Sequence, residues 1–407
     1  MLVNCLPAWI NCNVDCEKHR STLKKLCRAR RHTDSVGQLR VLYLYVTRAC
    51  NLRCKHCWVS GGEIAAGELS IGEVHAVLSD AAQLGARRVK ITGGEPFVRR
   101  DLMKILEYAA GLGFEQEIET NATLITPEVA RELVQFRNVR LIVSLDGASA
   151  PSHEFIRKER GSYESTTRGL GVLRNLNARV NLTTLVHKKN LSELREIIEI
   201  GLAKGVENHR FILTLQWLGR GRTCEDVELS WSEISRCVQE IYAIRRELGS
   251  TTGVGTSHST LPPALQPVDE VEFTDCGWGR TLCGVLSTGD VSICGAAYET
   301  LSLVAGNIRQ QPLSSIWEKS HFFSLLRSIK YTDLEGICGN CIVAPMCRGM
   351  CRVNAFAVYG KLTAPYPFCQ LAYNKNCFPT YALVDKDRDC NFENLKRPRS
   401  RASGRKP

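Results

Sequence analysis

The sequence lacks long hydrophobic segments. No stretch approaches the roughly 18 consecutive apolar residues that a membrane-spanning helix requires. The N-terminus, MLVNCLPAWIN, has neither the extended apolar run nor the small-residue cleavage site of a secretory signal. No repeat of the solenoid type is present. These absences favour a soluble, cytoplasmic protein with no membrane partner, and 44% apolar residues are sufficient for a large core.

The central part of the chain also lacks an excess of charge. Residues 1–32 carry seven Lys/Arg and two acids, and residues 396–407 carry six Lys/Arg and no acid. These ends account for the whole net charge of +11, so the rest is neutral. A protein that follows phosphates needs a basic face, so we expect no nucleic-acid partner. The basic ends are either solvated arms or segments that steer an acidic partner.

Cysteine, in contrast, is abundant, with 19 residues in a chain of 407. Without a secretory signal, so many thiols favour metal or cluster ligation over disulfides. Eight of them fall outside the two groups described below and are interpreted as ordinary thiols or packing residues, although the four before residue 30 could instead bind a metal or a sulfur-containing partner. These eight are Cys5, Cys12, Cys16, Cys27, Cys224, Cys237, Cys377 and Cys390.

The first half of the chain alternates between strand and helix patterns. Apolar runs of strand length occur at 41–47, 88–92, 117–120, 139–145, 180–186 and 209–215. Helical spacing follows between them, as at 71–84, which opens with the capping box Ser70 to Glu73. Strands separated by helices imply a parallel sheet. Six such units predict an α/β fold, a partial (β/α)6 TIM-like barrel.

Four regions follow from these patterns. We predict a basic N-terminal segment at 1–39, the barrel at 40–250, a small cysteine-rich domain at 251–372 and a basic, partly disordered tail at 373–407. In barrels the chemistry lies at the C-terminal ends of the strands. That rule points to Cys50–Cys57, Gly93–Pro96, Asn121 and Ser144–Asp146.

The first cysteine group is Cys50-Asn51-Leu52-Arg53-Cys54-Lys55-His56-Cys57. A four-iron cluster normally takes four thiolates, so three on one loop would leave one iron for a substrate to chelate. A zinc site usually closes with four ligands in paired spacing. A redox CxxC pair would not explain Cys50. His56 is interpreted as a solvent-facing or packing residue.

This group resembles the CxxxCxxC signature of the radical SAM superfamily, in which three cysteines hold a [4Fe-4S] cluster and S-adenosylmethionine (SAM) occupies the fourth iron. Gly93, Gly94, Glu95 and Pro96 resemble the family's GGEP motif, whose backbone and acid meet the SAM amino group. Asn121, Ser144, Asp146 and Arg157 are similar to residues that contact the SAM ribose and carboxylate. Ala122 departs from the family, which commonly has glycine there.

The resemblance implies a radical mechanism. One-electron reduction of the cluster cleaves SAM to methionine and a 5′-deoxyadenosyl radical, which abstracts hydrogen from a bound substrate. The cofactor supplies this chemistry, and the protein positions the reactants and excludes water. An electron donor such as flavodoxin or ferredoxin is expected as a partner.

The second cysteine group lies between residues 276 and 369. Its eight thiols suffice for two four-thiolate clusters or for two structural zinc sites. The segment resembles the SPASM domain, including Gly289, Gly306-Asn307-Ile308 and Ser315-Ile316-Trp317. The resemblance implies two auxiliary [4Fe-4S] clusters, one held by Cys276, Cys283, Cys294 and Cys351 and the other by Cys338, Cys341, Cys347 and Cys369.

The expected substrate is a peptide or protein. SPASM enzymes act mostly on these, and residues 276–280, CGWGR, resemble the enzyme that cross-links the precursor of pyrroloquinoline quinone. Thioether formation, carbon–carbon cross-linking, epimerisation and excision all remain open. The basic N-terminal segment is a candidate contact for an acidic leader peptide. The roughly 40 residues before the first strand are too few for the familiar leader-binding domain, which either weakens that idea or leaves recognition to a separate leader-binding protein. The alternatives are sulfatase activation, small-molecule or haem maturation, and a non-catalytic iron–sulfur scaffold.

Overall fold

The strands of the protein form a single sheet in the computed structural model, which describes residues 16–30, 37–249, 253–257, 261–266 and 276–385. The order is β10-β9-β8-β1-β2-β3-β4-β5-β6-β7. The pairs from β8 to β7 are parallel, and β8–β9 and β9–β10 are antiparallel. The strands are β1 Val41–Thr47, β2 Arg88–Gly93, β3 Glu115–Thr120, β4 Val139–Ser144, β5 Val180–Leu185, β6 Asn208–Ile212, β7 Gly253–Thr256, β8 Leu282–Val285, β9 Asp290–Ser292 and β10 Val304–Asn307.

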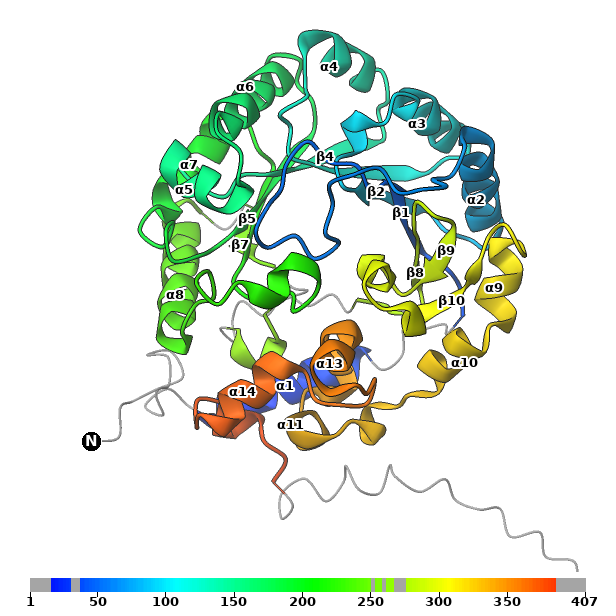
Figure 1. Ribbon diagram of the computed structural model, residues 1–407. Helices are drawn as coiled ribbons and strands as arrows, with labels where there is room; N and C mark the ends of the chain where they lie inside the picture. Colours follow the sequence, from blue (N-terminus) through cyan, green and yellow to red (C-terminus); the bar gives the residue numbers. More distant parts are fainter. Residues whose placement is uncertain (1–15, 31–36, 250–252, 258–260, 267–275, 386–407) are drawn as a thin grey trace, which may run out of the picture.

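Helices form an outer ring around the strands, and the loop that follows β1 crosses the middle of that ring (Figure 1). This arrangement confirms the predicted TIM-like α/β barrel, with the six predicted strands as β1–β6. The helices are α1 Cys16–Arg30, α2 Ile71–Gln83, α3 Leu102–Gly111, α4 Pro127–Leu133, α5 Ala150–Arg157, α6 Ser162–Asn175, α7 Leu194–Ala203, α8 Trp231–Glu247, α9 Leu313–Lys319, α10 His321–Ser328, α11 Gly336–Gly339, α12 Ala344–Cys347, α13 Arg352–Tyr359 and α14 Pro367–Asn374.

Helix α2 shows how the sequence pattern produces a barrel helix. Ser70 is its N-cap residue, and the hydroxyl oxygen accepts a hydrogen bond from the backbone N–H of Glu73. The Glu73 carboxylate in turn accepts from the backbone N–H of Ser70 at 2.8 Å, which completes the predicted capping box. Val74 and Leu78 on one face are fully buried against the sheet.

The sheet extends beyond the six predicted strands. Strands β7 and β8 both fall in the predicted cysteine-rich domain at 251–372. β8 pairs with β1 in parallel, so that Leu42 lies beside Cys283 and Tyr43 beside Gly284. The cysteine-rich segment therefore adds strands to the barrel sheet. Periodicity missed these strands because each has only four residues and its partner is distant in sequence.

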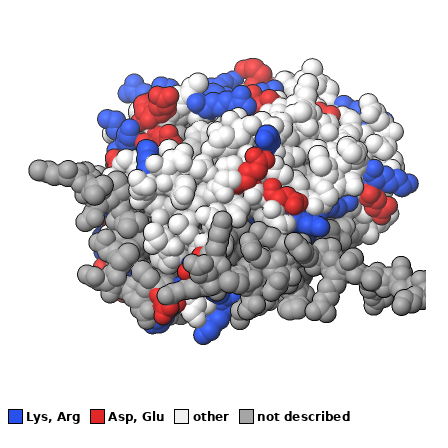
Figure 2. Space-filling view, turned by 90° about the horizontal axis from the view of Figure 1, so that it is seen from below, with Lys and Arg blue, Asp and Glu red and all other residues white. Residues whose placement is uncertain are grey.

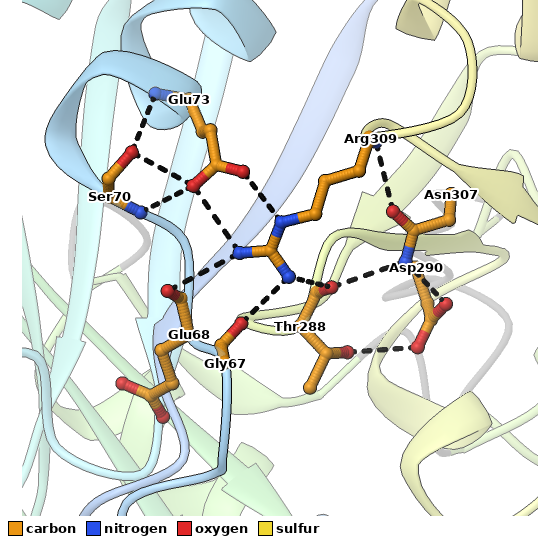
Figure 3. A network of polar contacts seen from close by, with 8 residues as sticks. All are labelled: Gly67, Glu68, Ser70, Glu73, Thr288, Asp290, Asn307 and Arg309. Atoms are coloured by element: carbon orange, nitrogen blue, oxygen red, sulfur yellow. Dashed lines mark hydrogen bonds and ion pairs between the residues drawn. The ribbon is translucent and has the colours of Figure 1, made fainter.

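A polar network joins the β9–β10 hairpin to the barrel (Figure 3). Arg309, which follows β10, donates from Nε to Glu73 Oε1 at 2.6 Å and from Nη1 to the Gly67 carbonyl at 2.9 Å. Asn307 donates to Asp290 within the hairpin at 2.9 Å. The capping box of α2 therefore also anchors the SPASM-like segment.

The N-terminal helix packs against the C-terminal part of the chain. α1 contacts α12 and the 3₁₀ turn Thr380–Ala382, and Leu23 and Cys27 are buried there. Arg20 donates to the carbonyl oxygens of Tyr381 and Leu383. Residues 16–30 are thus not a solvated arm, and the folded chain continues past residue 373. The remainder of both basic ends, including the tail predicted to be disordered, lies outside the described residues.

On the face shown in Figure 2, Lys and Arg side chains lie among Asp and Glu side chains. This mixture agrees with the neutral charge of the central part of the sequence. In the part of the chain that the structure describes, no helix is long and apolar enough to span a membrane.

Candidate functional site

The three-cysteine loop begins directly after β1. Cys54 is buried, and Cys50 and Cys57 are half-buried. The backbone N–H of Leu52 donates to Cys50 Sγ at 3.4 Å, and that of Gly61 donates to Cys57 Sγ at 3.3 Å. Burial, with the nearby Glu95 and the other two thiols, raises the pKa of Cys50 to about 12. A buried thiol such as Cys50 needs a nearby cation to become a thiolate, and three cysteines on one loop fit an iron–sulfur cluster.

Other elements hold the backbone of this loop. Arg220 donates from Nε to the Cys54 carbonyl at 2.8 Å and from Nη1 to the Gly61 carbonyl at 3.0 Å. The backbone N–H of Lys55 donates to the Ile156 carbonyl at the end of α5. Arg220 was not predicted as a site residue, because it lies far away in the sequence and in no recognisable motif.

The Gly93–Pro96 turn packs directly on the end of β1. A Cβ atom on Gly93 would lie 2.1 Å from the Thr47 carbonyl oxygen, and one on Gly94 would lie 2.1 Å from the Ala49 carbonyl oxygen. Gly93 also has a φ of +144°. Only glycine fits either position, because any side chain would push the turn away from the cysteine loop.

The Glu95 carboxylate faces protein donors and is 1% exposed. Oε1 accepts from Thr120 Oγ1 at 2.8 Å and from the Phe97 N–H at 3.2 Å, and Oε2 accepts from the Asn121 N–H at 2.8 Å. Burial raises the pKa of Glu95 to about 7. These contacts join the turn to the end of β3, and the expected role of Glu95 toward the SAM amino group stays a prediction.

Asn121 links the end of β3 to the cysteine loop. Its Nδ2 donates to Asn51 Oδ1 at 3.0 Å, and its Oδ1 accepts from the Thr123 N–H at 2.9 Å. The next residue, Ala122, has a φ of +58°, in the left-handed region that favours glycine. Gly169 makes room for it, because a Cβ there would lie 2.3 Å from the Ala122 carbonyl oxygen.

Asp146 and Arg157 form a buried ion pair beside Cys54. Arg157 Nη2 lies 2.7 Å from Asp146 Oδ2, and Arg157 Nη1 donates to Cys54 Sγ at 3.7 Å. Burial acts to raise the pKa of Asp146, but Arg157 holds it below the usual value. Asp146 Oδ1 also accepts from the Leu185 N–H at 2.8 Å. Ser144 lies half-buried at the end of β4, beside Thr183.

Three histidines surround this pair. The Asp146 N–H donates to His153 Nδ1 at 3.1 Å, and His187 Nε2 lies 3.2 Å from the Asp146 carbonyl oxygen. Burial lowers the pKa of His56 to about 4 and that of His153 to about 3. These rings are therefore neutral and leave the Arg157 guanidinium as the cation next to the cysteine loop. Sequence alone did not single out His153 or His187.

The structure brings four thiols of the second group together. Cys338, Cys341, Cys347 and Cys369 line one cavity, together with apolar neighbours such as Tyr366 and Phe378. The backbone N–H of Tyr366 donates to Cys338 Sγ at 3.2 Å. Burial, together with the other thiols, raises the pKa of Cys369 well above its usual value. A four-thiol cavity lined otherwise by apolar groups fits a [4Fe-4S] cluster.

The other predicted set is not brought together as a whole. Cys294 lies on the Gly284 side of β8, where a Cβ on Gly284 would approach the Cys294 Cα to 2.8 Å. Cys276 is an electrostatic neighbour of Tyr43, which pairs with Gly284. Burial and this thiol raise the pKa of Tyr43 to about 12, against the lowering effect of Lys90.

Cys283 points to the opposite face of the sheet, because side chains alternate along a strand. It is fully buried, and Arg327 is its electrostatic neighbour. Cys351 lies beside Gln216. The structure therefore does not bring Cys283 together with the other members of this set. In the described part of the chain, no three His, Cys, Asp or Glu side chains are placed to hold a single metal ion.

Two family models match the chain. Residues 44–200 match the radical SAM superfamily, and residues 276–342 match the SPASM iron–sulfur cluster-binding domain. The AdoMet-dependent heme synthase of Methanosarcina barkeri is 33% identical over 349 residues, which cover 81% of this chain and 96% of that protein. The mycofactocin maturase MftC of Mycobacterium tuberculosis is 30% identical over 328 residues, which cover 80% of this chain and 81% of that one.

Solved structures share the fold. SuiB of Streptococcus suis bound to S-adenosylmethionine has a TM-score of 0.68 at 18% identity and covers 87% of this chain and 81% of its own. Native anSMEcpe with AdoMet and a peptide has a TM-score of 0.63 at 17% identity and covers 88% and 99%. The protein belongs to the radical SAM superfamily and carries a SPASM domain, so it is an enzyme that uses SAM, a [4Fe-4S] cluster and auxiliary iron–sulfur clusters.

Proposed function

We propose that the protein modifies a ribosomally made peptide by radical chemistry started at the Cys50, Cys54 and Cys57 loop. The observation that carries the radical-forming role is three converging thiols with a buried guanidinium, Arg157, beside the central one. A [4Fe-4S] cluster bound there supplies the electron that cleaves SAM and so yields the radical that abstracts hydrogen from the substrate. Cys50, Cys54 and Cys57 would hold such a cluster and would leave one iron for the SAM amino and carboxylate groups to bind.

The chain's own residues then have positioning roles. Arg157, fixed by Asp146, places positive charge beside Cys54, which favours the thiolate over the thiol. Arg220 and Asn121 hold the loop through its backbone and through Asn51. Gly93 and Gly94 let the second strand end approach the loop closely. The SAM contacts predicted from the sequence all stay proposals: Gly93, Gly94, Glu95, Pro96, Asn121, Ser144, Asp146 and Arg157.

We assign the auxiliary clusters from the same geometry. Cys338, Cys341, Cys347 and Cys369 hold the distal cluster in their shared cavity. Cys276, Cys294 and Cys351 serve the other cluster, without Cys283, which faces away.

The peptide substrate is supported by two observations. The mycofactocin maturases are among the relatives at 30% identity, and residues 276–280 resemble a peptide-cross-linking enzyme. A separate leader-binding protein and a flavodoxin or ferredoxin complete the proposed partners.

A second candidate is maturation of an iron tetrapyrrole. It is favoured by the AdoMet-dependent heme synthases, at 33% and 30% identity, and by an Fe-coproporphyrin III synthase at 29%. Both candidates need the same cluster loop, so the site geometry does not separate them.

One anaerobic experiment separates the two substrates. Reconstituted enzyme with SAM and dithionite is offered either peptides from short reading frames beside the gene or Fe-coproporphyrin III. We expect a peptide to raise 5′-deoxyadenosine formation and to change in mass, while Cys54→Ala gives neither. Turnover of Fe-coproporphyrin III alone would replace the peptide proposal with the second candidate.

A further inference from the structure

Arg352 is among the most deeply buried charged residues of the protein. It is the first residue of α13, directly after Cys351 of the second cysteine group, and is 1% exposed. Nη1 donates to the carbonyl oxygens of Leu362 at 3.1 Å and Ala364 at 2.6 Å, and Nη2 donates to that of Gly349. Nε is buried and has no hydrogen-bond partner in the described structure.

These contacts leave the charge of the guanidinium without a counter-ion. All three acceptors are neutral carbonyls, and in the described residues no carboxylate forms an ion pair with Arg352. A buried, unpaired cation costs several kcal/mol, on the order of the whole stability of many domains. The position at the start of a helix adds to that cost, because the helix dipole disfavours a cation there.

The groups that face Arg352 electrostatically are cysteines of both auxiliary sets. Cys338, Cys347 and Cys369 belong to the four-thiol cavity, and Cys351 belongs to the other set. Gly349, which accepts a hydrogen bond from Arg352, also lines the four-thiol cavity. Arg352 therefore lies beside that cavity and directly after Cys351.

The backbone around Arg352 is shaped to keep it there. Gly349 has a φ of +75°, and a Cβ on it would lie 2.3 Å from Arg352 Nη2. The guanidinium therefore packs directly on the Gly349 backbone. Nη1 and Nη2 of Arg352 donate to carbonyls of two separate chain segments, 362–364 and 349. These contacts fix the orientation of the guanidinium.

We propose that Arg352 is the fixed counter-charge of the distal auxiliary cluster, held by Cys338, Cys341, Cys347 and Cys369, and raises its reduction potential. A cluster held by thiolates is an anion, and taking up one electron from a reductant such as dithionite makes it more negative by one charge. A fixed cation stabilises the reduced form more than the oxidised form. This proposal rests on the auxiliary clusters and not on the identity of the substrate.

The test is an EPR-monitored redox titration of the reconstituted full chain with dithionite. In Arg352→Gln, we expect the reduced-to-oxidised ratio of the distal cluster at a fixed potential to fall roughly tenfold to a hundredfold. A tenfold change equals about 59 mV for a one-electron couple. Arg352→Lys keeps the charge and should stay within about threefold of the wild type. Arg309→Gln removes an equal but 40% exposed charge and should change the ratio less than twofold.

Three results would overturn the proposal. The first is an unchanged ratio in Arg352→Gln with full iron content. The second is an equal fall in Arg309→Gln, which would show a general charge effect. The third is loss of iron from both Arg352→Gln and Arg352→Lys, which would assign the residue to loop packing. SAM cleavage at the first cluster is measured in parallel, because its loss would question the radical-forming site and not this proposal.

Discussion

Arg157 pairs with Asp146 at 2.7 Å while its other nitrogen reaches toward Cys54 at 3.7 Å. One side chain thus connects the end of β4 to the central cysteine of the loop after β1. The pair is buried on both sides, so neither charge is screened by water.

Breaking this pair should destabilise the protein strongly. Asp146→Asn leaves Arg157 buried without its counter-ion, and we expect a loss of about 3 kcal/mol in the free energy of unfolding. Urea unfolding of the cluster-free protein measures it. Because the pKa of Asp146 is lowered in the folded state, the wild-type advantage is present at neutral pH and is lost as the pH falls. An unchanged midpoint in Asp146→Asn would contradict the ion-pair interpretation.

Glu95 should have the opposite pH dependence. Burial raises its pKa from 4.5 to about 7, so the folded state binds the proton more tightly than the unfolded state. As the pH rises from 4.5 to 7, the unfolding free energy of the wild type should therefore fall by roughly 3 kcal/mol relative to that of Glu95→Gln. Comparing the two proteins at each pH removes the contribution of the histidines. A flat difference would show that Glu95 ionises normally.

Cys283 should be dispensable for cluster binding. It faces the side of β8 away from Cys294. We expect Cys283→Ala to keep the iron content of the wild type and Cys294→Ala to lose the iron of one cluster. Anaerobic reconstitution with iron analysis and EPR distinguishes them. Loss of the same cluster in both variants would restore Cys283 as a ligand.

Ala122 offers a test of local strain beside the site. An alanine in the left-handed region costs about 1–2 kcal/mol. Glycine removes this strain, but it loses more conformational entropy on folding, which offsets part of the gain. We therefore expect Ala122→Gly to raise the unfolding free energy by about 0.5 kcal/mol. Gly169→Ala should lower it by about 2 kcal/mol, because the new Cβ would meet the Ala122 carbonyl oxygen. Thermal unfolding of Ala122→Gly and of Gly169→Ala, each compared with the wild type, measures both changes.

Loss of the Arg309–Glu73 contact should loosen the β9–β10 hairpin more than it lowers the stability of the whole protein. Arg309, together with Ser70, lowers the pKa of Glu73 to about 2, so the contact is present above about pH 4.5 and is lost as the pH falls toward 2. Both side chains are partly exposed, so Arg309→Gln should cost only about 0.5–1 kcal/mol. Hydrogen exchange at β9 and β10 should nevertheless accelerate. Equal acceleration at distant strands such as β4 would indicate global destabilisation instead.

The sequence predicted the elements whose signals are local. Strands β1–β6 and the capping box of α2 follow from periodicity and from residues three positions apart. Strands β7 and β8 were missed, because four residues carry too little pattern and the pairing partner lies elsewhere in the chain. The packing of α1 on the C-terminal segment was missed because its partners lie at the other end of the chain.

The same distinction between local and long-range signals applies to the candidate site. By itself the sequence determined the family chemistry, because CxxxCxxC and GGEP place thiols and glycines at fixed short spacings on neighbouring strand ends. The tertiary structure decided which face Cys283 points to, what the Glu95 carboxylate binds, and that Arg220 and Arg352 belong to the sites at all. Those facts depend on strand register and on long-range packing, which no short window of sequence contains.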